Sequence, residues 1–339
     1  MAPPAWPEVE AIIAASDIAP AIRFGAEGLL RSDAGFAAFG DHEQVLRRAD
    51  ASERLAFYAV SRLLGRASFD DRRRLLDQLP QPTSPVAELE VDRRAGLLLT
   101  DQSHWAPVTA AVEEAKAAFS APRTDPAPAN PGKRFMTTAR LPGEALDSKI
   151  AALGRHPAVL GLVGRYLEGA PILYRINLLE SANDALQDNS SQFFHIDPED
   201  FRQLKIFMLV SDVDEDSGPL HALSADASDE VRIAHRHRLT RLADEEVMGL
   251  APAQALLRCT GPGGTLAIVD TSRCFHFGSR PGKSKRHVVM YQYITPFACA
   301  FPIDADAASS KYSDALRRRI AEAGQPASEL DARLFGLVR

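Results

Sequence analysis

The sequence predicts an α+β protein in which helices precede a β-sandwich or barrel. Up to about residue 90, apolar residues recur every three or four positions between charges, which is the pattern of amphipathic helices. From about residue 171 the chain changes to short runs of β-branched, aromatic and aliphatic residues, several of them separated by turn-forming clusters. Helices followed by a series of mostly antiparallel strands are typical of an α+β fold built on a sandwich or barrel.

The first 90 residues are expected to form a helical extension that packs on a core at 91–339. A proline cluster at 80–85 ends the helical pattern, because three prolines in six residues cannot continue a helix. The cluster is followed by an expected strand at 95–100 and an expected helix at 105–121. The Pro- and Gly-rich segment 121–133 is either an ordered lid or a mobile loop.

The second half of the chain carries the strands. Between two of them a polar helical insertion is expected at about 229–258, and a C-terminal helix at about 309–324. Runs with strand composition occupy 171–180, 191–197, 203–213, 263–270 and 286–295.

Composition limits the partners and the compartment. A net charge of −6 and a pI of about 5.9 argue against a nucleic-acid partner, which normally leaves a basic surface. No apolar run approaches the roughly 18 residues of a membrane span, and no basic segment followed by an apolar core marks a secretion signal. Three cysteines without a CxxC pair indicate reduced thiols. We therefore expect a cytoplasmic protein that has no membrane or nucleic-acid partner.

A possible metal site begins with the pair His195 and Asp197. On a strand, residues two apart point to the same face, so both side chains can enter one cavity. His276, which follows a predicted strand, fits as a third ligand. Two imidazoles and one carboxylate leave other positions of a non-heme Fe(II) open. A hairpin at the turn after His276 is expected to return Arg286 beside it, where a guanidinium can bind a dicarboxylate. The spacing predicts an oxygenase that uses Fe(II), 2-oxoglutarate and O2.

From Gly96 to Phe301 the sequence resembles the phytanoyl-CoA dioxygenase family, which includes the ectoine hydroxylases. The matching segments include RIN at 175–177, FFHIDPEDF at 193–201, KIFMLVSDVDEDSGPL at 205–220, and the stretch containing His276 and Arg286. The resemblance implies a double-stranded β-helix, a jelly-roll with iron at one open end. The chain departs from the family at Gly278, where a hydroxyl residue is frequent, and lacks the family's P-G-S-H run.

The resemblance also implies residue roles. His195, Asp197 and His276 would bind iron, Arg286 would hold the C5 carboxylate of 2-oxoglutarate, and Asn177 would contact the co-substrate. Arg175 shares the strand face of Asn177 by alternation, which makes it a candidate substrate contact. Asn177 fits equally well as an inward polar residue that ties adjacent strands together.

The expected reaction is hydroxylation of an unactivated C–H bond of a small metabolite, or a related desaturation or ring closure. Asp197 disfavours halogenation, because iron-dependent halogenases leave the position of the carboxylate to chloride. Two alternatives stay open: a non-catalytic jelly-roll that binds a metal or ligand or acts as a sensor, and a cupin-type enzyme without an oxoacid co-substrate. A homo-oligomer is equally compatible with the sequence.

Overall fold

The computed structural model describes residues 6–30, 50–121, 136–139, 148–181, 191–236 and 241–296. Most of the Pro-rich segment 121–133 and all of the C-terminal helix expected at 309–324 lie outside these residues. No helix among the described residues is long and apolar enough to cross a membrane.

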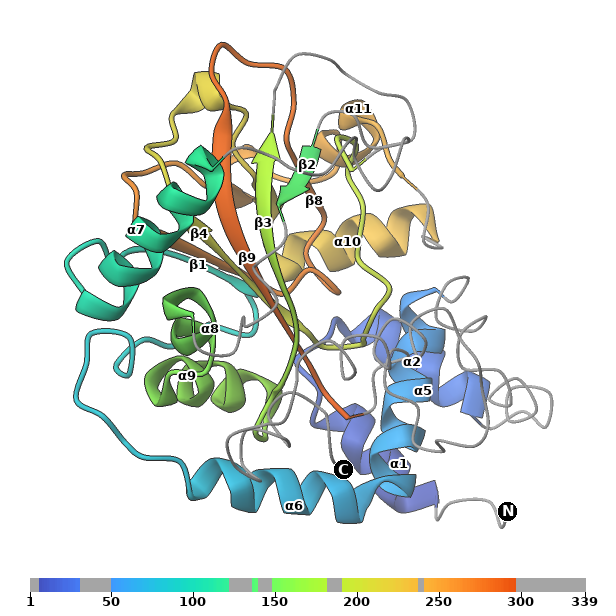
Figure 1. Cartoon of the computed structure of the whole chain (residues 1–339). Coiled ribbons are helices and arrows are strands. Elements are labelled where there is room, and N and C mark those ends of the chain that lie inside the picture. Colours follow the sequence, from blue (N-terminus) through green and yellow to red (C-terminus); the bar gives the residue numbers. More distant parts are fainter. Residues whose placement is uncertain are drawn as a thin grey trace.

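Two antiparallel sheets form the centre of the molecule (Figure 1). The large sheet has the strand order β1-β7-β4-β9-β3-β2, and the small sheet has the order β6-β5-β8. The strands are β1 (Leu97–Asp101), β2 (Met136–Ala139), β3 (Ile172–Ser181), β4 (Leu204–Leu209), β5 (His221–Leu223), β6 (Leu256–Arg258), β7 (Thr265–Val269), β8 (His276–Phe277) and β9 (Arg286–Ile294).

The chain passes repeatedly from one sheet to the other. After β3 in the large sheet, His195 pairs with His276 of the small sheet, and β4 returns to the large sheet. Strands β5 and β6 then belong to the small sheet, β7 to the large, β8 to the small and β9 to the large. This alternation between two antiparallel sheets is the jelly-roll arrangement. The predicted double-stranded β-helix is confirmed.

Two local expectations from the sequence were wrong. The segment 191–197 forms isolated bridges at Phe194 and His195 in place of a full strand, and Pro198 beyond it has no N–H for a ladder. The expected hairpin between β8 and β9 is absent, because β8 pairs with β5 whereas β9 pairs with β3 and β4. His276 and Arg286 therefore belong to opposite sheets.

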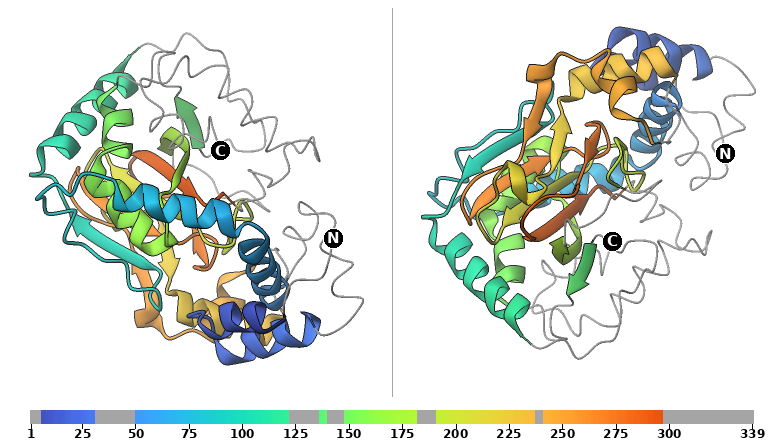
Figure 2. Two further views of the ribbon diagram at one scale, coloured as in Figure 1. Left: turned by 90° about the horizontal axis from the view of Figure 1, so that it is seen from below. Right: turned by 90° about the horizontal axis from the view of Figure 1, so that it is seen from above.

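Helices cover the outer face of the large sheet (Figures 1 and 2). Apolar side chains of α7, α8 and α9 pack against outward residues of the strands such as Ile206, Ile268 and Tyr291. The hydroxyl of Tyr291 donates a hydrogen bond to the carbonyl of Ile150 at 3.0 Å, which anchors α8 to β9. The other, inner face of the large sheet therefore points toward the small sheet. The helices are α7 (Ala106–Ser120), α8 (Lys149–Gly154) and α9 (Pro157–Leu167).

A helical segment lies between β5 and β6, where an insertion was expected. It starts at Ala225, four residues before the expected boundary. Ser224 occupies the N-cap position with an extended backbone, and the acidic Asp226 stands in the first turn, as is typical of a helix start. Its elements are α10 (Ala225–His235), α11 (Asp244–Met248) and the 3-10 helix η4 (Ala253–Ala255).

The N-terminal helices form a second apolar cluster beside the sheets. Helix α5 begins with a capping box, in which the Asp50 carboxylate accepts the N–H of Glu53 and the Glu53 carboxylate accepts the N–H of Asp50. Phe57 of α5 stacks on Phe201, with ring centroids 5.2 Å apart, so the cluster reaches the segment that follows Asp197. The helices are α1 (Trp6–Ala14), α2 (Pro20–Leu30), α5 (Ala51–Leu64) and α6 (Arg66–Asp77).

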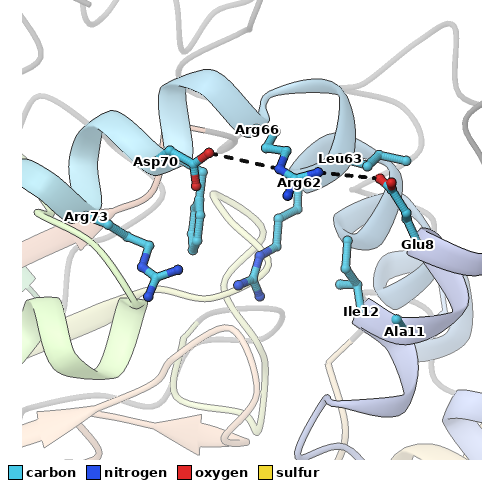
Figure 3. Close-up of a pocket in the computed structure, with 9 residues that line it drawn as sticks. Glu8, Ala11, Ile12, Arg62, Leu63, Arg66, Asp70 and Arg73 are labelled. Atoms are coloured by element: carbon cyan, nitrogen blue, oxygen red, sulfur yellow. Dashed lines mark ion pairs between the residues drawn. The ribbon is translucent and has the colours of Figure 1, made fainter.

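A pocket of about 350 Å³ lies between α1, α5 and α6 (Figure 3). On its wall, Arg66 lies 3.7 Å from the Glu8 carboxylate and 4.0 Å from that of Asp70. All three side chains are largely exposed, and exposed ion pairs contribute only about 0–1 kcal/mol. The pocket is therefore a surface feature of the helical extension. Its lining residues are distant in sequence from the residues predicted to bind metal.

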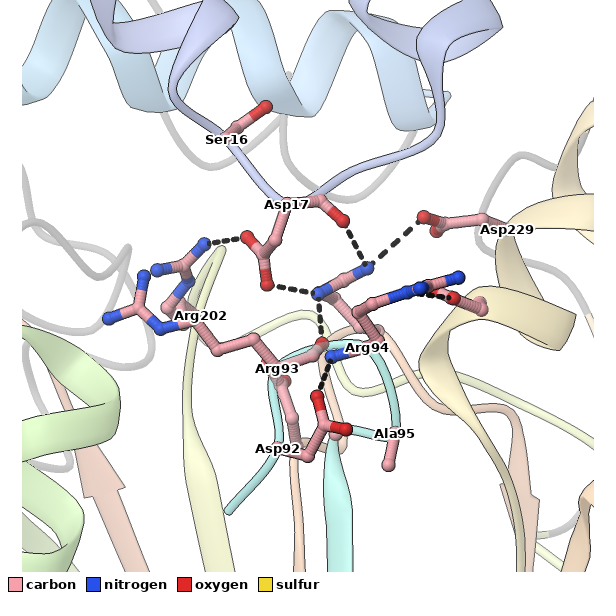
Figure 4. A network of polar contacts seen from close by, with 12 residues as sticks. Ser16, Asp17, Asp92, Arg93, Arg94, Ala95, Arg202 and Asp229 are labelled. Atoms are coloured by element: carbon pink, nitrogen blue, oxygen red, sulfur yellow. Dashed lines mark hydrogen bonds and ion pairs between the residues drawn. The ribbon is translucent and has the colours of Figure 1, made fainter. Parts of the chain in front are cut away.

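Asp17, in the turn between α1 and α2, fastens the extension to the core (Figure 4). Its carboxylate accepts hydrogen bonds from Arg202 at 2.6 Å and from Arg273 at 2.9 Å. Arg273 also pairs with the buried Asp229 of α10 at 3.1 Å. Burial opposes ionisation of Asp17, but the two guanidinium groups lower the pKa of its carboxyl. Arg202 and Arg273 lie close in sequence to Asp197 and His276, so the extension braces both segments.

Asp17→Asn should destabilise the fold, because it leaves two buried guanidinium groups without their shared carboxylate. Breaking such a pair costs about 3 kcal/mol of unfolding free energy, measurable by urea denaturation. The matched control is Asp226→Asn, which removes an exposed partner of Arg94 at 2.9 Å and should cost about 0–1 kcal/mol. Equal losses in the two variants would contradict the bracing role of Asp17.

Candidate metal centre and co-substrate site

The backbone brings His195 and His276 face to face. Each residue donates its N–H to the carbonyl of the other at 3.0 Å, so the two form a directly paired couple between neighbouring segments. Their imidazole rings lie side by side, with centroids 4.3 Å apart. Two residues beyond His195, the N–H of Asp197 donates to the carbonyl of Thr271 at 2.8 Å. The three predicted ligands thus meet although Asp197 and His276 are distant in sequence.

Hydrogen bonds fix which nitrogen of each ring is free. His195 Nδ1 lies 2.9 Å from the carbonyl of Phe193, and His276 Nδ1 lies 3.0 Å from the carbonyl of Cys274. A carbonyl only accepts, so each Nδ1 carries the proton and each Nε2 keeps its lone pair. Those Nε2 atoms lie 3.9 Å and 3.3 Å from the oxygens of Asp197.

The three ligand atoms all lie within 4.8 Å of one another. This is a two-histidine, one-carboxylate group. Such a group, with Nδ1 held by a backbone carbonyl, is the donor set of non-heme Fe(II) centres. The residues therefore fit a metal ion of this kind.

Burial and neighbouring charges together keep His195 and Asp197 in the protonation states that a metal requires. Desolvation, followed by repulsion from His276, lowers the pKa of His195 to about 3. Desolvation alone would raise the pKa of Asp197, but Lys205 and His276 hold it well below its usual value. At neutral pH the set therefore offers a neutral His195 imidazole and a carboxylate, as metal binding demands.

Lys205 is a residue of the site that the sequence analysis did not single out. It lies on β4 with only 7% of its surface exposed, and its ammonium group donates to Oδ2 of Asp197 at 2.7 Å. Burial opposes the charge, but Asp197 and Glu199 raise the pKa of Lys205. The available signal was a lone lysine inside the apolar run 204–210, since a buried lysine is rare unless it is paired.

Arg286 begins β9 and is a buried cation. Only 6% of the residue is exposed, and within the described part of the chain its one hydrogen bond goes to Ser181 Oγ at 3.5 Å and its Nε has no partner. It forms no ion pair with a carboxylate among the described residues, and burial lowers its pKa to about 10. A buried charge without a partner is costly, so the position is suited to an anionic ligand.

The inner face of the large sheet joins these residues. Gln292 of β9 lies opposite Arg175 of β3 on one side and Lys205 of β4 on the other. A bulge next to Arg175 shifts the register, and bulges often redirect a side chain near a site. Arg286 shares the face of Gln292 six residues away, or roughly 20 Å at 3.3 Å per residue. Arg175 and Arg286 therefore lie at opposite ends of this face.

Arg175 and Asn177 lie on this face, as their alternation predicted. Arg175 is half-buried and donates to the hydroxyl of Tyr174 at 3.2 Å, and it forms no ion pair within the described part of the chain. Asn177, also half-buried, lies opposite Met290, between the two ends of the face.

Comparisons with known proteins gave matches among solved structures alone: no family model and no curated protein matches the chain. The epimerase SnoN, in complex with Fe3+, alpha ketoglutarate and nogalamycin RO, is 16% identical over 69% of this chain and 86% of its own, with a TM-score of 0.39. EctD from S. alaskensis, with 2-oxoglutarate and 5-hydroxyectoine, is 15% identical over 64% and 82%, with a TM-score of 0.43. HygX from Streptomyces hygroscopicus, with nickel and 2-oxoglutarate, is 13% identical over 59% and 83%, with a TM-score of 0.41. These likenesses are low, and the function proposed below depends on the site itself.

Proposed function

We propose that the protein is an Fe(II)- and 2-oxoglutarate-dependent oxygenase that hydroxylates a C–H bond of a small molecule. The observation that carries the proposal is the convergence of His195, Asp197 and His276. Two Nε2 lone pairs and one ionised carboxylate face one another, with both Nδ1 atoms already held by backbone carbonyls. This donor set suits Fe(II) and leaves further coordination positions for other ligands.

Each remaining residue has a role in this proposal. Arg286, a buried guanidinium with no carboxylate partner among the described residues, binds the C5 carboxylate of 2-oxoglutarate, and Asn177 contacts the co-substrate from β3. Arg175, at the far end of the same face, binds the substrate. Fe(II) together with 2-oxoglutarate supplies the oxidation of the C–H bond by O2, with release of succinate and CO2.

Two features favour this reaction over its alternatives. Asp197 supplies a carboxylate where iron-dependent halogenases leave a place for chloride, which favours hydroxylation. Arg286 argues against a cupin-type enzyme without an oxoacid, because such an enzyme has no use for a buried cation that finds no carboxylate among the described residues.

The proposal is tested by adding Fe(II) and 2-oxoglutarate to the purified protein without oxygen. We expect a visible metal-to-ligand charge-transfer band, because the oxoacid chelates the iron through its carboxylate and keto oxygens. Admitting oxygen should then produce succinate. A folded, metal-loaded protein without the band would contradict the proposal. A band without oxygen-dependent succinate would favour the binding or sensor alternative.

A further inference from the structure

Lys205 donates a hydrogen bond to one of the two oxygens of the Asp197 carboxylate, a predicted metal ligand. Its Nζ donates to Oδ2 of Asp197 at 2.7 Å, whereas no hydrogen bond within the described part of the chain reaches Oδ1. Oδ1 lies 3.9 Å from His195 Nε2, and Oδ2 lies 3.3 Å from His276 Nε2. The carboxylate is therefore asymmetric in its hydrogen bonds: Oδ2 accepts one from the ammonium group, whereas Oδ1 accepts none within the described part of the chain.

The position of Lys205 is tightly constrained. It sits in register between Val269 of β7 and Gln292 of β9, in the interior of the large sheet, so its backbone cannot shift without disturbing two ladders. Taking an ammonium group out of water costs several kcal/mol unless a partner compensates. Asp197 is the one hydrogen-bond acceptor that the described residues offer it, so the pair persists as a unit.

The asymmetry matters because a carboxylate binds a metal through one oxygen or through two. With two histidines and one carboxylate oxygen, a six-coordinate metal keeps three open positions, whereas a carboxylate bound through both oxygens closes one of them. The proposed reaction needs all three, two of them for the oxoacid. A group that holds one oxygen of Asp197 away from the metal would protect these positions.

We propose that Lys205 is a positioning residue that restricts Asp197 to binding the metal through a single oxygen. It acts through Asp197 and contacts neither the oxoacid nor the substrate. The inference rests on the proposed function, and it adds to the three metal ligands a residue that controls how one of them binds.

The test compares Lys205→Met with wild type under saturating cobalt(II) or Fe(II), without oxygen. Because the freed carboxylate can then close a position, the dissociation constant of 2-oxoglutarate should rise roughly 10-fold, the lower end of the 10–100-fold effects of residues behind metal ligands. The visible spectrum of the cobalt(II) protein before oxoacid is added should change, because it reports the coordination number. Lys283→Met is the matched control: Lys283 also pairs at 2.7 Å, with the exposed Asp216, and should change neither readout.

Lys205→Gln keeps a hydrogen-bond donor for Oδ2 without the charge, and it also serves if the Met variant fails to fold. We expect it to retain the wild-type cobalt spectrum and most of the affinity for 2-oxoglutarate. If Lys205→Gln behaves as Lys205→Met is expected to, the charge and not the held oxygen is responsible, and the inference fails. It also fails if the cobalt spectrum is unchanged in Lys205→Met, whatever happens to stability. Absence of metal binding by wild type would instead overturn the proposed function itself.

Discussion

Asp197→Ala should abolish metal binding and turnover together. The variant removes the only carboxylate of the triad and leaves two imidazoles beside the cation of Lys205, which repels a metal ion. Since loss of a residue behind a ligand already costs roughly 10–100-fold in metal affinity, loss of the ligand should cost at least about 100-fold. Calorimetric titration with Fe(II) or cobalt(II) measures the affinity, and the anaerobic 2-oxoglutarate band should disappear.

The interpretation requires that the variant folds, because Lys205 loses its partner inside the protein. Asp197→Asn keeps the shape of the side chain and an oxygen for Lys205 while it removes the charge. We expect it to remain folded and to bind metal far more weakly than wild type. Asp216→Ala, which removes the exposed partner of Lys283, should leave metal affinity unchanged. Wild-type metal affinity in both Asp197 variants would show that the triad is not the metal site.

Arg286→Met should weaken 2-oxoglutarate binding without weakening the fold. Truncating one partner of a buried charge pair costs about 2–5 kcal/mol of binding free energy. A loss of about 3 kcal/mol corresponds to an affinity on the order of 100-fold lower. The unfolding free energy should stay equal or rise, because the substitution removes a buried cation that has no counter-ion among the described residues. Anaerobic titration of the charge-transfer band and urea denaturation measure the two effects.

An oxoacid without the second carboxylate separates this role from a general disturbance. 2-Oxovalerate keeps the chelating carboxylate and keto group but ends in a methyl group. Wild type should bind it far more weakly than 2-oxoglutarate, whereas Arg286→Met should discriminate little between the two. Arg258→Met, which removes an exposed arginine paired with Glu215 at 3.7 Å, is the control and should retain discrimination. Full discrimination in Arg286→Met would exclude Arg286 as the carboxylate partner.

Much of the fold was accessible from the sequence because its signals are local. Runs of β-branched, aromatic and aliphatic residues marked β3, β4, β7 and β9, and the helical pattern marked α5 and α7. The expected hairpin between β8 and β9 failed for a non-local reason. Whether the residues after His276 form a hairpin depends on which sheet β8 joins, and the pairing of β8 with β5 is decided by packing between sheets.

The identity and order of the predicted metal ligands can be read directly from the chain. The spacing of His195 and Asp197 places both side chains on one face of an extended chain, and no tertiary information is needed for that. Arg286 could be named from its spacing to His276, although the hairpin expected to bring the two side by side is absent.

How these residues contact one another depends on the packing of the two sheets. Three features depend on segments that are far apart in the chain. They are the pairing of His195 with His276, the lack of a carboxylate partner for Arg286 among the described residues, and the contact between Lys205 and Asp197. Burial and partner choice arise when two sheets close on each other, because only then does a side chain lose water and need a specific partner. The sequence pattern around a residue does not specify which partner it will contact.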